Sequence, residues 1–259
     1  YVGGSGAMLT NTWVGSYWVG ADGNWIPNYD PDQNAKWVQD GNTWYYQRTD
    51  GSRITNSWKK INGTWYYFAG SGAMLTGWNV VGGSWYFFNG SGAMQTGWGQ
   101  VDGSWYYFGG DGAMKTGWQQ VGGTWYYLKD NGVMQTGWIL EQKQWYFADG
   151  TGAMRTGWLH KGGSWFYLQE NGAMCTGWKD IGGTWYYFRP GNGDMMTGWV
   201  RDRETWYYMS GSGAMQTGWL KHGTAWYYLS GSGAMAKDWT QVRGCLLYTS
   251  PSPRDGLLS

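Results

Sequence analysis

The stretch Met94–Phe108, MQTGWGQVDGSWYYF, holds the pattern that recurs through most of this chain. Two short aromatic runs, each with one tryptophan (Trp98 and Trp105), flank the dipeptide Asp102-Gly103. Asp-Gly between two such runs is typical of a two-residue β-hairpin turn, because both central residues must adopt a positive φ. The stretch therefore predicts one tight hairpin.

Copies of this hairpin follow one another from Trp37 onwards. The first tryptophan recurs every 20 residues, with two steps of 21, and the second follows seven residues later. Gly-rich loops such as Gly90-Ser91-Gly92 separate the copies and disfavour helix. An isolated hairpin is marginal in water, whereas tandem copies can bury a face on each neighbour. We therefore predict an all-β solenoid of about ten stacked β-hairpins over residues 37–244, with a distorted turn at Glu141–Gln144, where glycine is missing.

Two segments flank this array on its N-terminal side. Residues 1–26 hold a partial, irregular repeat, and because Tyr1–Met8 matches the second half of a copy we expect the sequence to be part of a longer protein. Residues 27–36 contain two prolines and several Asx residues, which predicts a linker or loop. Asp30 and Asp32 lack the later Gly and Glu of a calcium loop, so a plain turn is favoured there.

The C-terminal segment departs from the repeat. Residues 245–259, beginning CLLYTSPSPRD, resemble the conceptual translation of a sequencing adapter. We expect them to be an assembly artefact without fold or function, in the way that fusion scars are. Trp239 is then orphaned, and Trp219 and Trp226 have no following hairpin.

Composition restricts the classes of function. The chain has 24 Trp, 21 Tyr and 47 Gly in 259 residues, so aromatic rings must supply both the core and any binding surface. A net charge of +1 offers no field for nucleic acid. No apolar run approaches the roughly 18 residues of a membrane span, so no membrane insertion is expected. The two cysteines, Cys175 and Cys245, do not predict a disulfide framework.

The alternation of side chains along paired strands predicts where the rings lie. Pairing across the Gly82-Gly83 turn sets Val80 opposite Trp85 and Trp78 opposite Phe87, so the two tryptophans share one face. If successive hairpins stack, that face meets the first tyrosine of the next Trp-Tyr-Tyr, which is Tyr106. Each junction then forms a three-walled aromatic pocket, which a methionine of the intervening loop can close.

Such a pocket suits a quaternary ammonium, whose charge is diffuse and weakly hydrated. The candidate ligand-binding residues are Trp37, Trp44 and Tyr66; Trp58, Trp65 and Tyr86; Trp78, Trp85 and Tyr106; Trp98, Trp105 and Tyr126; Trp118, Trp125 and Tyr146; Trp138, Trp145 and Phe166; Trp158, Trp165 and Tyr186; Trp178, Trp185 and Tyr207; Trp199, Trp206 and Tyr227; with Met74, Met94, Met114, Met134, Met154, Met174, Met195 and Met215. Phe166 replaces the expected tyrosine. A single copy, holding parts of two pockets, should bind nothing.

The run Thr96-Gly97-Trp98, Gly103, Trp105-Tyr106-Tyr107-Phe108 and Gly112-Ala113-Met114 resembles the choline-binding repeats of Gram-positive surface proteins, autolysins and phage lysins. The resemblance covers residues 37–239 and, weakly, 1–26. It implies a left-handed β-solenoid with choline sites between consecutive hairpins. It also implies an extracellular, cell-wall-associated protein held noncovalently by choline-bearing teichoic or lipoteichoic acid.

Other interpretations stay open at this point. The tryptophans can serve packing alone in a structural stalk, and related repeats bind glucans by stacking rings on sugar faces. The array can also be the anchoring part of a peptidoglycan hydrolase. Scattered acids and the variable His160 and His222 form no pattern for catalysis or a metal, so no active site, cofactor or metal is expected within this sequence. The oligomeric state is left undetermined.

Overall fold

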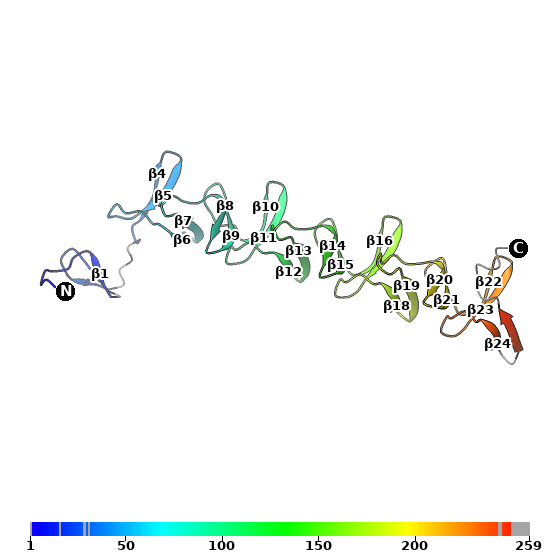
Figure 1. The fold of residues 1–259 in the computed structure, drawn as a ribbon. Coiled ribbons are helices and arrows are strands. Elements are labelled where there is room, and N and C mark those ends of the chain that lie inside the picture. The colour runs from blue at the N-terminus through cyan, green and yellow to red at the C-terminus, as the bar shows by residue number, and fades with distance from the viewer. Residues whose placement is uncertain (1, 16, 28–29, 31, 243–244, 250–259) are drawn as a thin grey trace. The chain divides into compact units, whose positions relative to one another are not determined.

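The computed structural model describes residues 2–15, 17–27, 30, 32–242 and 245–249 of the chain (Figure 1). All regular secondary structure in these residues is β-strand. Among the same residues there is no helix long and apolar enough to cross a membrane. The chain divides into two units, Tyr1–Lys115 and Thr116–Ser259, and each is described by itself.

The first unit holds eleven strands. These are β1 (Thr12–Val14), β2 (Tyr17–Val19), β3 (Trp25–Ile26), β4 (Lys36–Asp40), β5 (Thr43–Gln47), β6 (Ser57–Ile61), β7 (Thr64–Phe68), β8 (Gly77–Val81), β9 (Ser84–Phe88), β10 (Gly97–Val101) and β11 (Ser104–Phe108). From β4 onwards, each odd-numbered strand pairs with the strand before it as an antiparallel two-stranded hairpin.

The second unit continues the same alternation. Its strands are β12 (Gly117–Val121), β13 (Thr124–Leu128), β14 (Gly137–Glu141), β15 (Gln144–Ala148), β16 (Gly157–Lys161), β17 (Ser164–Leu168), β18 (Gly177–Ile181), β19 (Thr184–Phe188), β20 (Gly198–Asp202), β21 (Thr205–Met209), β22 (Gly218–His222), β23 (Ala225–Leu229), β24 (Asp238–Val242) and β25 (Cys245–Thr249). Successive strands pair as hairpins.

The register of the hairpins agrees with the pairing predicted from the sequence. In the β8–β9 hairpin Val81 pairs with Ser84, Val80 with Trp85 and Trp78 with Phe87. Opposite residues of an antiparallel pair project to the same face. The two tryptophans of each hairpin therefore lie on one face, as expected.

The hairpin turns use two residues with positive φ. Gly82 and Gly83 have φ of 59° and 83°, and Asp102 and Gly103 have 48° and 78°. The distorted turn expected at Glu141–Gln144 is not found, because Glu141 pairs with Gln144 in the common register. The cost falls on the backbone instead, since Gln142 and Lys143 occupy the left-handed region with φ of 48° and 64°.

Loops connect each hairpin to its predecessor. After β9, Met94 forms a bridge with Phe88, and the Met94 amide donates to the Trp65 carbonyl of the preceding hairpin at 2.9 Å. The same methionine-to-tryptophan hydrogen bond, 2.7–2.9 Å long, recurs as Met74 to Trp44, Met114 to Trp85, Met154 to Trp125, Met174 to Trp145, Met195 to Trp165, Met215 to Trp185 and Met235 to Trp206. Each of these junctions, all within one unit, is thus fixed by backbone hydrogen bonds as well as by rings.

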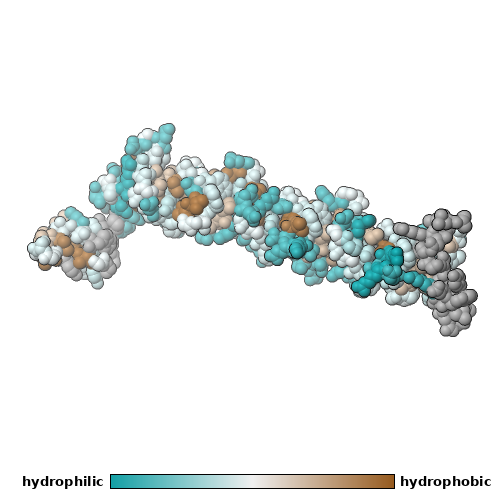
Figure 2. All heavy atoms as spheres, viewed as in Figure 1, coloured by the Kyte–Doolittle hydropathy of each residue, from teal (hydrophilic) through white to brown (hydrophobic). Residues whose placement is uncertain are grey.

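The core is supplied by the last residue of the second strand in nine of the hairpins. These residues are fully buried: Phe68, Phe88, Phe108, Leu128, Ala148, Leu168, Phe188, Met209 and Leu229. On the surface, hydrophobic residues appear as separate areas among pale and hydrophilic ones (Figure 2). Tryptophan, tyrosine and glycine lie near the middle of that hydropathy scale.

The N-terminal segments are more ordered than predicted. Strands β1, β2 and β3 form a three-stranded sheet, in which Trp13 pairs with Trp18. In the loop that follows, Asp32 accepts from Arg48 Nε at 2.7 Å and Lys59 Nζ at 2.5 Å, and its side chain is only 14% exposed. The acid that superficially suggests a calcium loop instead ties this loop to the first two regular hairpins.

The C-terminal segment corrects two expectations. Cys245–Thr249 is not without fold: it forms β25 and pairs with β24, Trp239 opposite Tyr248. Trp219 and Trp226 are therefore followed by a hairpin. The register nevertheless puts Leu247 opposite Thr240, where the other units have an aromatic residue, and residues 250–259 lie outside the described part of the chain.

Candidate cation-binding cages

Most hairpins present two tryptophan rings at close to right angles. In nine hairpins the ring centroids of the two tryptophans are 6.2–6.5 Å apart, with interplanar angles of 76–90°. Their positions on the same face follow from the hairpin register. Two perpendicular walls are therefore built from local sequence alone.

The third wall comes from the next hairpin, as predicted. Trp78 lies 4.8 Å from Tyr106, centroid to centroid. The same contact, 4.6–5.0 Å long, joins Trp37 to Tyr66, Trp58 to Tyr86, Trp118 to Tyr146, Trp138 to Phe166, Trp158 to Tyr186, Trp178 to Tyr207 and Trp199 to Tyr227. We call each such set of two tryptophans and the ring of the next hairpin a cage.

The residues of one predicted cage, that of Trp98, are divided between the two units. Trp98 and Trp105 belong to the first unit, whereas Tyr126 and Met134 belong to the second. Each half has the local structure of its equivalents, and the joint site stays a prediction from the sequence.

The second tryptophan of most hairpins is exposed. Trp44, Trp65, Trp85, Trp105, Trp125, Trp145, Trp165, Trp185 and Trp226 are 37–59% exposed, although tryptophan is highly buried on average. A regular series of exposed rings is unusual for side chains that serve packing alone. The second tyrosine of each unit has the packing role, as expected: Tyr107 lies 5.1 Å from Trp98 in its own hairpin.

Methionines complete the cages, with an assignment that the sequence left open. The cavity at Trp37, Trp44 and Tyr66, about 370 Å³, is lined by Met74. The cavity at Trp178, Trp185 and Tyr207, about 420 Å³, is lined by Met215. The methionine of a cage therefore follows the hairpin that supplies the third ring.

Met235 was missed by sequence reasoning. It is 4% exposed and packs with Tyr227 and Leu229, beside Trp199 and Trp206. The signal was present, because Gly233-Ala234-Met235 repeats the Gly-Ala-Met that precedes the other units.

A fourth element of the cages was also missed. Ser91, which lies in the loop after β9, lines the Trp37 cavity, and Ser232, in the loop after β23, lines the Trp178 cavity. Both loops come two hairpins after the one that supplies the tryptophans. A complete cage therefore needs three consecutive hairpins, where the sequence indicated two.

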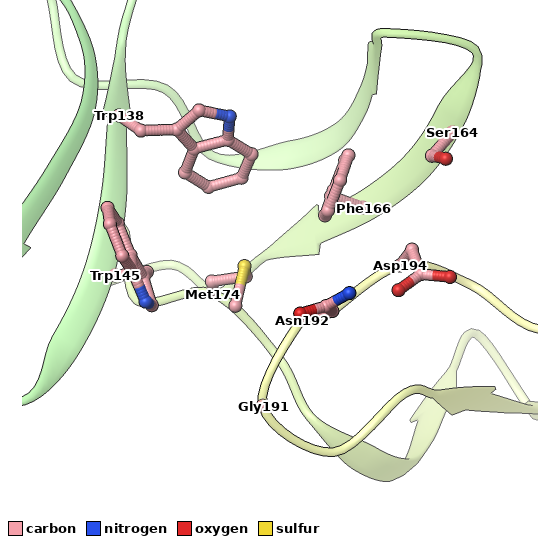
Figure 3. A pocket seen from close by; sticks show the side chains of 8 residues that line it. All are labelled: Trp138, Trp145, Ser164, Phe166, Met174, Gly191, Asn192 and Asp194. Atoms are coloured by element: carbon pink, nitrogen blue, oxygen red, sulfur yellow. The ribbon is translucent and has the colours of Figure 1, made fainter.

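The cage at Trp138 differs from the others in chemistry. Its cavity, about 350 Å³, is lined by Trp138, Trp145, Phe166 and Met174, with Ser164, Gly191, Asn192 and Asp194 (Figure 3). Phe166 forms the third wall at 4.9 Å from Trp138. The loop with the extra residue, after β19, adds an amide and a carboxylate at this cavity.

Two aromatic side chains donate hydrogen bonds to carboxylates of the next hairpin. Trp178 Nε1 donates to Asp202 Oδ2 at 3.0 Å, and Tyr127 Oη donates to Glu141 Oε2 at 2.6 Å. The hydrogen bond to Glu141, together with burial, raises the pKa of Tyr127 to about 12. Both carboxylates end the first strand of the next hairpin, so each hydrogen bond joins two neighbouring hairpins.

The Cys175 thiol and the His160 ring lie among other side chains of the fold. Burial raises the pKa of the Cys175 thiol. The rings of His160 and Trp165 lie 4.8 Å apart, and among the described residues no group of three His, Cys, Asp or Glu is arranged to hold a metal ion.

Comparison with solved structures gives close likenesses. CbpJ from Streptococcus pneumoniae is 35% identical, with a TM-score of 0.67, and the match covers 84% of this chain and 92% of that chain. Choline binding protein F from the same organism, crystallised in the presence of a peptidoglycan analogue, is 33% identical with a TM-score of 0.64, covering 84% and 91%. The pneumococcal modular autolysin LytC, in complex with a synthetic peptidoglycan ligand, is 28% identical with a TM-score of 0.58, covering 83% of this chain and 51% of LytC.

Comparison with family models extends along nearly the whole sequence. One choline-binding repeat model matches residues 75–116, 115–156, 155–198 and 196–239, and a second matches residues 1–25. A cell wall binding repeat matches residues 36–52 and 56–74. No curated protein matches the sequence significantly. The matched repeats coincide with the hairpins that carry the cages, and the chain belongs to the choline-binding repeat family.

Proposed function

We propose that the chain is a noncovalent cell-wall attachment module whose cages bind the choline or phosphocholine groups of teichoic or lipoteichoic acids. The observation that carries the proposal is the recurring junction, in which a tryptophan pair with one exposed ring meets a third ring of the next hairpin at 4.6–5.0 Å. A protein attached in this way lies outside the cell, on the wall.

The physical basis of recognition is the electron-rich face of the rings. A trimethylammonium group spreads its charge over its methyl groups, so it enters an aromatic cage at a low desolvation cost. At ~0.5–2 kcal/mol per ring, less the cost of association, one cage should bind with a Kd on the order of 1 mM. Firm attachment then depends on several cages that engage a polymer with many choline groups, which can raise the apparent affinity by roughly 10²–10⁴.

Repeats of this family are binding modules, and the reactions of their larger relatives belong to other domains. The match to LytC spans 51% of a chain described as a modular autolysin. We infer that this array serves as the anchoring module and that any catalysis belongs to another domain.

The test is a titration of the full chain, with ¹³C-methyl methionine, by NMR. A methionine lines each cavity described above, so methyl signals report cages one by one. Choline should shift the signals of Met74, Met174 and Met215 with Kd values on the order of 1 mM. The neutral isostere 3,3-dimethylbutan-1-ol should bind at least tenfold more weakly, because it lacks the cation–π term.

Two outcomes would reject the proposal. Equal binding of choline and its neutral isostere would reduce the cages to apolar pockets. Shifts with isomalto-oligosaccharides but none with choline would favour the glucan-binding alternative. Retention on a choline resin and release by free choline provide an independent check on the whole chain.

A further inference from the structure

Two departures from the repeat meet in one cage. Phe166 occupies the place of the first tyrosine in the Trp138 cage. Asp194 occupies the place before methionine, where Ala93, Ala214 and other units have alanine. The two substitutions are 28 residues apart in the sequence (194 − 166 = 28), yet both side chains line the same cavity (Figure 3).

Only one of the two oxygens of the Asp194 carboxylate has a hydrogen-bond partner within the described residues. Its Oδ2 accepts from Arg189 Nε at 3.1 Å, and Arg189 is itself 53% exposed. Its Oδ1 is buried and has no hydrogen-bond partner within the described residues. A buried acceptor without a donor is costly, and more so when it is charged. The Asp194 side chain is still 20% exposed and lines the cavity, so a donor carried by a ligand can approach the carboxylate from there.

The other two cavities have no such group. Beside its rings and methionine, the Trp37 cavity is lined by Ser91 alone, and the Trp178 cavity by Gly231 and Ser232. Those cages can attract a cation only through rings and neutral dipoles. The Trp138 cage adds an anionic acceptor to the rings, so its preference among ammonium ions must differ.

We propose, building on the function proposed above, that the cage of Trp138, Trp145 and Phe166 is a carboxylate-assisted site that favours ammonium groups carrying an N–H. The chemical class is a protonated amino alcohol, for which N,N-dimethylethanolamine is the probe. A quaternary ammonium presents only methyl groups to Asp194, whereas a protonated tertiary amine donates a charge-assisted hydrogen bond to it. The loop after β19 thereby gives one cage a ligand range that its neighbours lack.

The test measures the ratio of two dissociation constants at each cage. The full chain, labelled with ¹³C-methyl methionine, is titrated with choline and with N,N-dimethylethanolamine at pH 7. Met174 reports the Trp138 cage and Met215 the Trp178 cage. The Kd for dimethylethanolamine relative to that for choline should be roughly tenfold lower at Met174 than at Met215.

Variants assign this effect to the carboxylate. Asp194→Ala installs the residue that most other units carry, and it should bring the ratio at Met174 to the value at Met215. Asp194→Asn, which keeps the shape and removes the charge, should lower the preference too. Asp102→Asn removes the same charge from an exposed hairpin turn in the first unit, and it should leave both ratios unchanged.

The outcomes separate this inference from the function on which it rests. Equal ratios at Met174 and Met215, or a ratio at Met174 that survives Asp194→Ala, overturn the carboxylate-assisted site while choline binding stands. If neither methyl responds to choline, the proposed function itself fails.

Discussion

Gly92 lies directly against the thioether of Met74, and a Cβ on Gly92 would overlap the Met74 sulfur. Gly92 belongs to the loop after β9, and Met74 lines the Trp37 cage. The same contact recurs between Gly112 and Met94, Gly152 and Met134, Gly172 and Met154, Gly193 and Met174, Gly213 and Met195, and Gly233 and Met215. Each of these glycines, which lies two residues before a methionine, thus leaves room for the methionine wall of an earlier cage.

Replacing this glycine should damage the cage without touching a ring. In Gly92→Ala the new methyl group must displace Met74, and the positive φ of 80° adds backbone strain. We expect choline binding at the Trp37 cage to weaken by roughly tenfold, since overpacking typically costs about 1–3 kcal/mol. The Met74 methyl signal in a choline titration measures this.

Gly90→Ala is the matched control in the same loop. A Cβ on Gly90 meets nothing within 4 Å, so this variant should bind choline as the wild type does. Equal effects of the two substitutions would show that loop stiffness, and not the contact with Met74, governs the site.

The hydrogen bond between Trp178 and Asp202 predicts that one substitution lowers the stability of the chain and that another, at the equivalent junction, raises it. Asp202→Ala leaves Trp178 Nε1 without its acceptor, so the stability of the chain should fall by about 1–2 kcal/mol. At the equivalent junction Trp199 Nε1 is buried without a partner within the described residues, and His222 stands where Asp202 stands.

His222→Asp should therefore give Trp199 the acceptor that it lacks. We expect a gain of about 1 kcal/mol in urea unfolding, whereas His222→Ala, which removes the imidazole without adding an acceptor, should give none. Stabilisation by both variants alike would mean that the imidazole itself is unfavourable there.

The turn between β14 and β15 contains strain that can be relieved. Lys143 is exposed and holds a φ of 64°, in the left-handed region that favours glycine. Lys143→Gly should raise the free energy of unfolding by about 1 kcal/mol, because a non-glycine residue there costs about 1–2 kcal/mol. Lys143→Ala, which keeps the Cβ, should give no comparable rise in thermal midpoint.

The Tyr127–Glu141 pair predicts a stability change at high pH. The folded protein raises the Tyr127 pKa from 10.0 to about 12, so the neutral phenol is favoured by folding. This stabilisation is complete below pH 10 and is lost as the pH rises through 12. Tyr127→Phe should be less stable than the wild type by about 1 kcal/mol at pH 8, and this difference should vanish near pH 12.

Urea unfolding of both proteins across this range measures the difference, and the subtraction cancels the other tyrosines. Glu141→Gln keeps an acceptor without charge, so it should retain part of the difference and shift its pH dependence downward. A constant difference from pH 8 to pH 12 would contradict the assignment.

The sequence predicts the hairpins and the ring that each one receives from its next neighbour. The Gly82-Gly83 turn fixes which residues are opposite, and side-chain alternation then places Trp78 and Trp85 on one face. The contact between Trp78 and Tyr106 follows once neighbouring hairpins are assumed to stack. Handedness rests on the resemblance alone and stays a prediction.

What the sequence could not predict depends on the rotation between hairpins. That rotation brings Ser91 to the Trp37 cage from two hairpins away and places Gly92 against Met74. The alternation of side chains along one strand does not determine this rotation. The eleventh hairpin was missed for a different reason. Residues 245–249 lack the repeat pattern, yet a run such as Leu-Leu-Tyr-Thr suits a strand and pairs with β24.

Each cavity takes its tryptophans, its third ring and its loop residues from the same relative positions in three consecutive hairpins. Tandem duplication of one 20-residue segment inserts a hairpin whose neighbours offer it the same positions. The array then gains one cage while every older cage keeps its contacts. Unequal recombination within the gene can therefore adjust binding valence stepwise, and a change in one loop, such as that after β19, can diversify a single cage without cost to the rest.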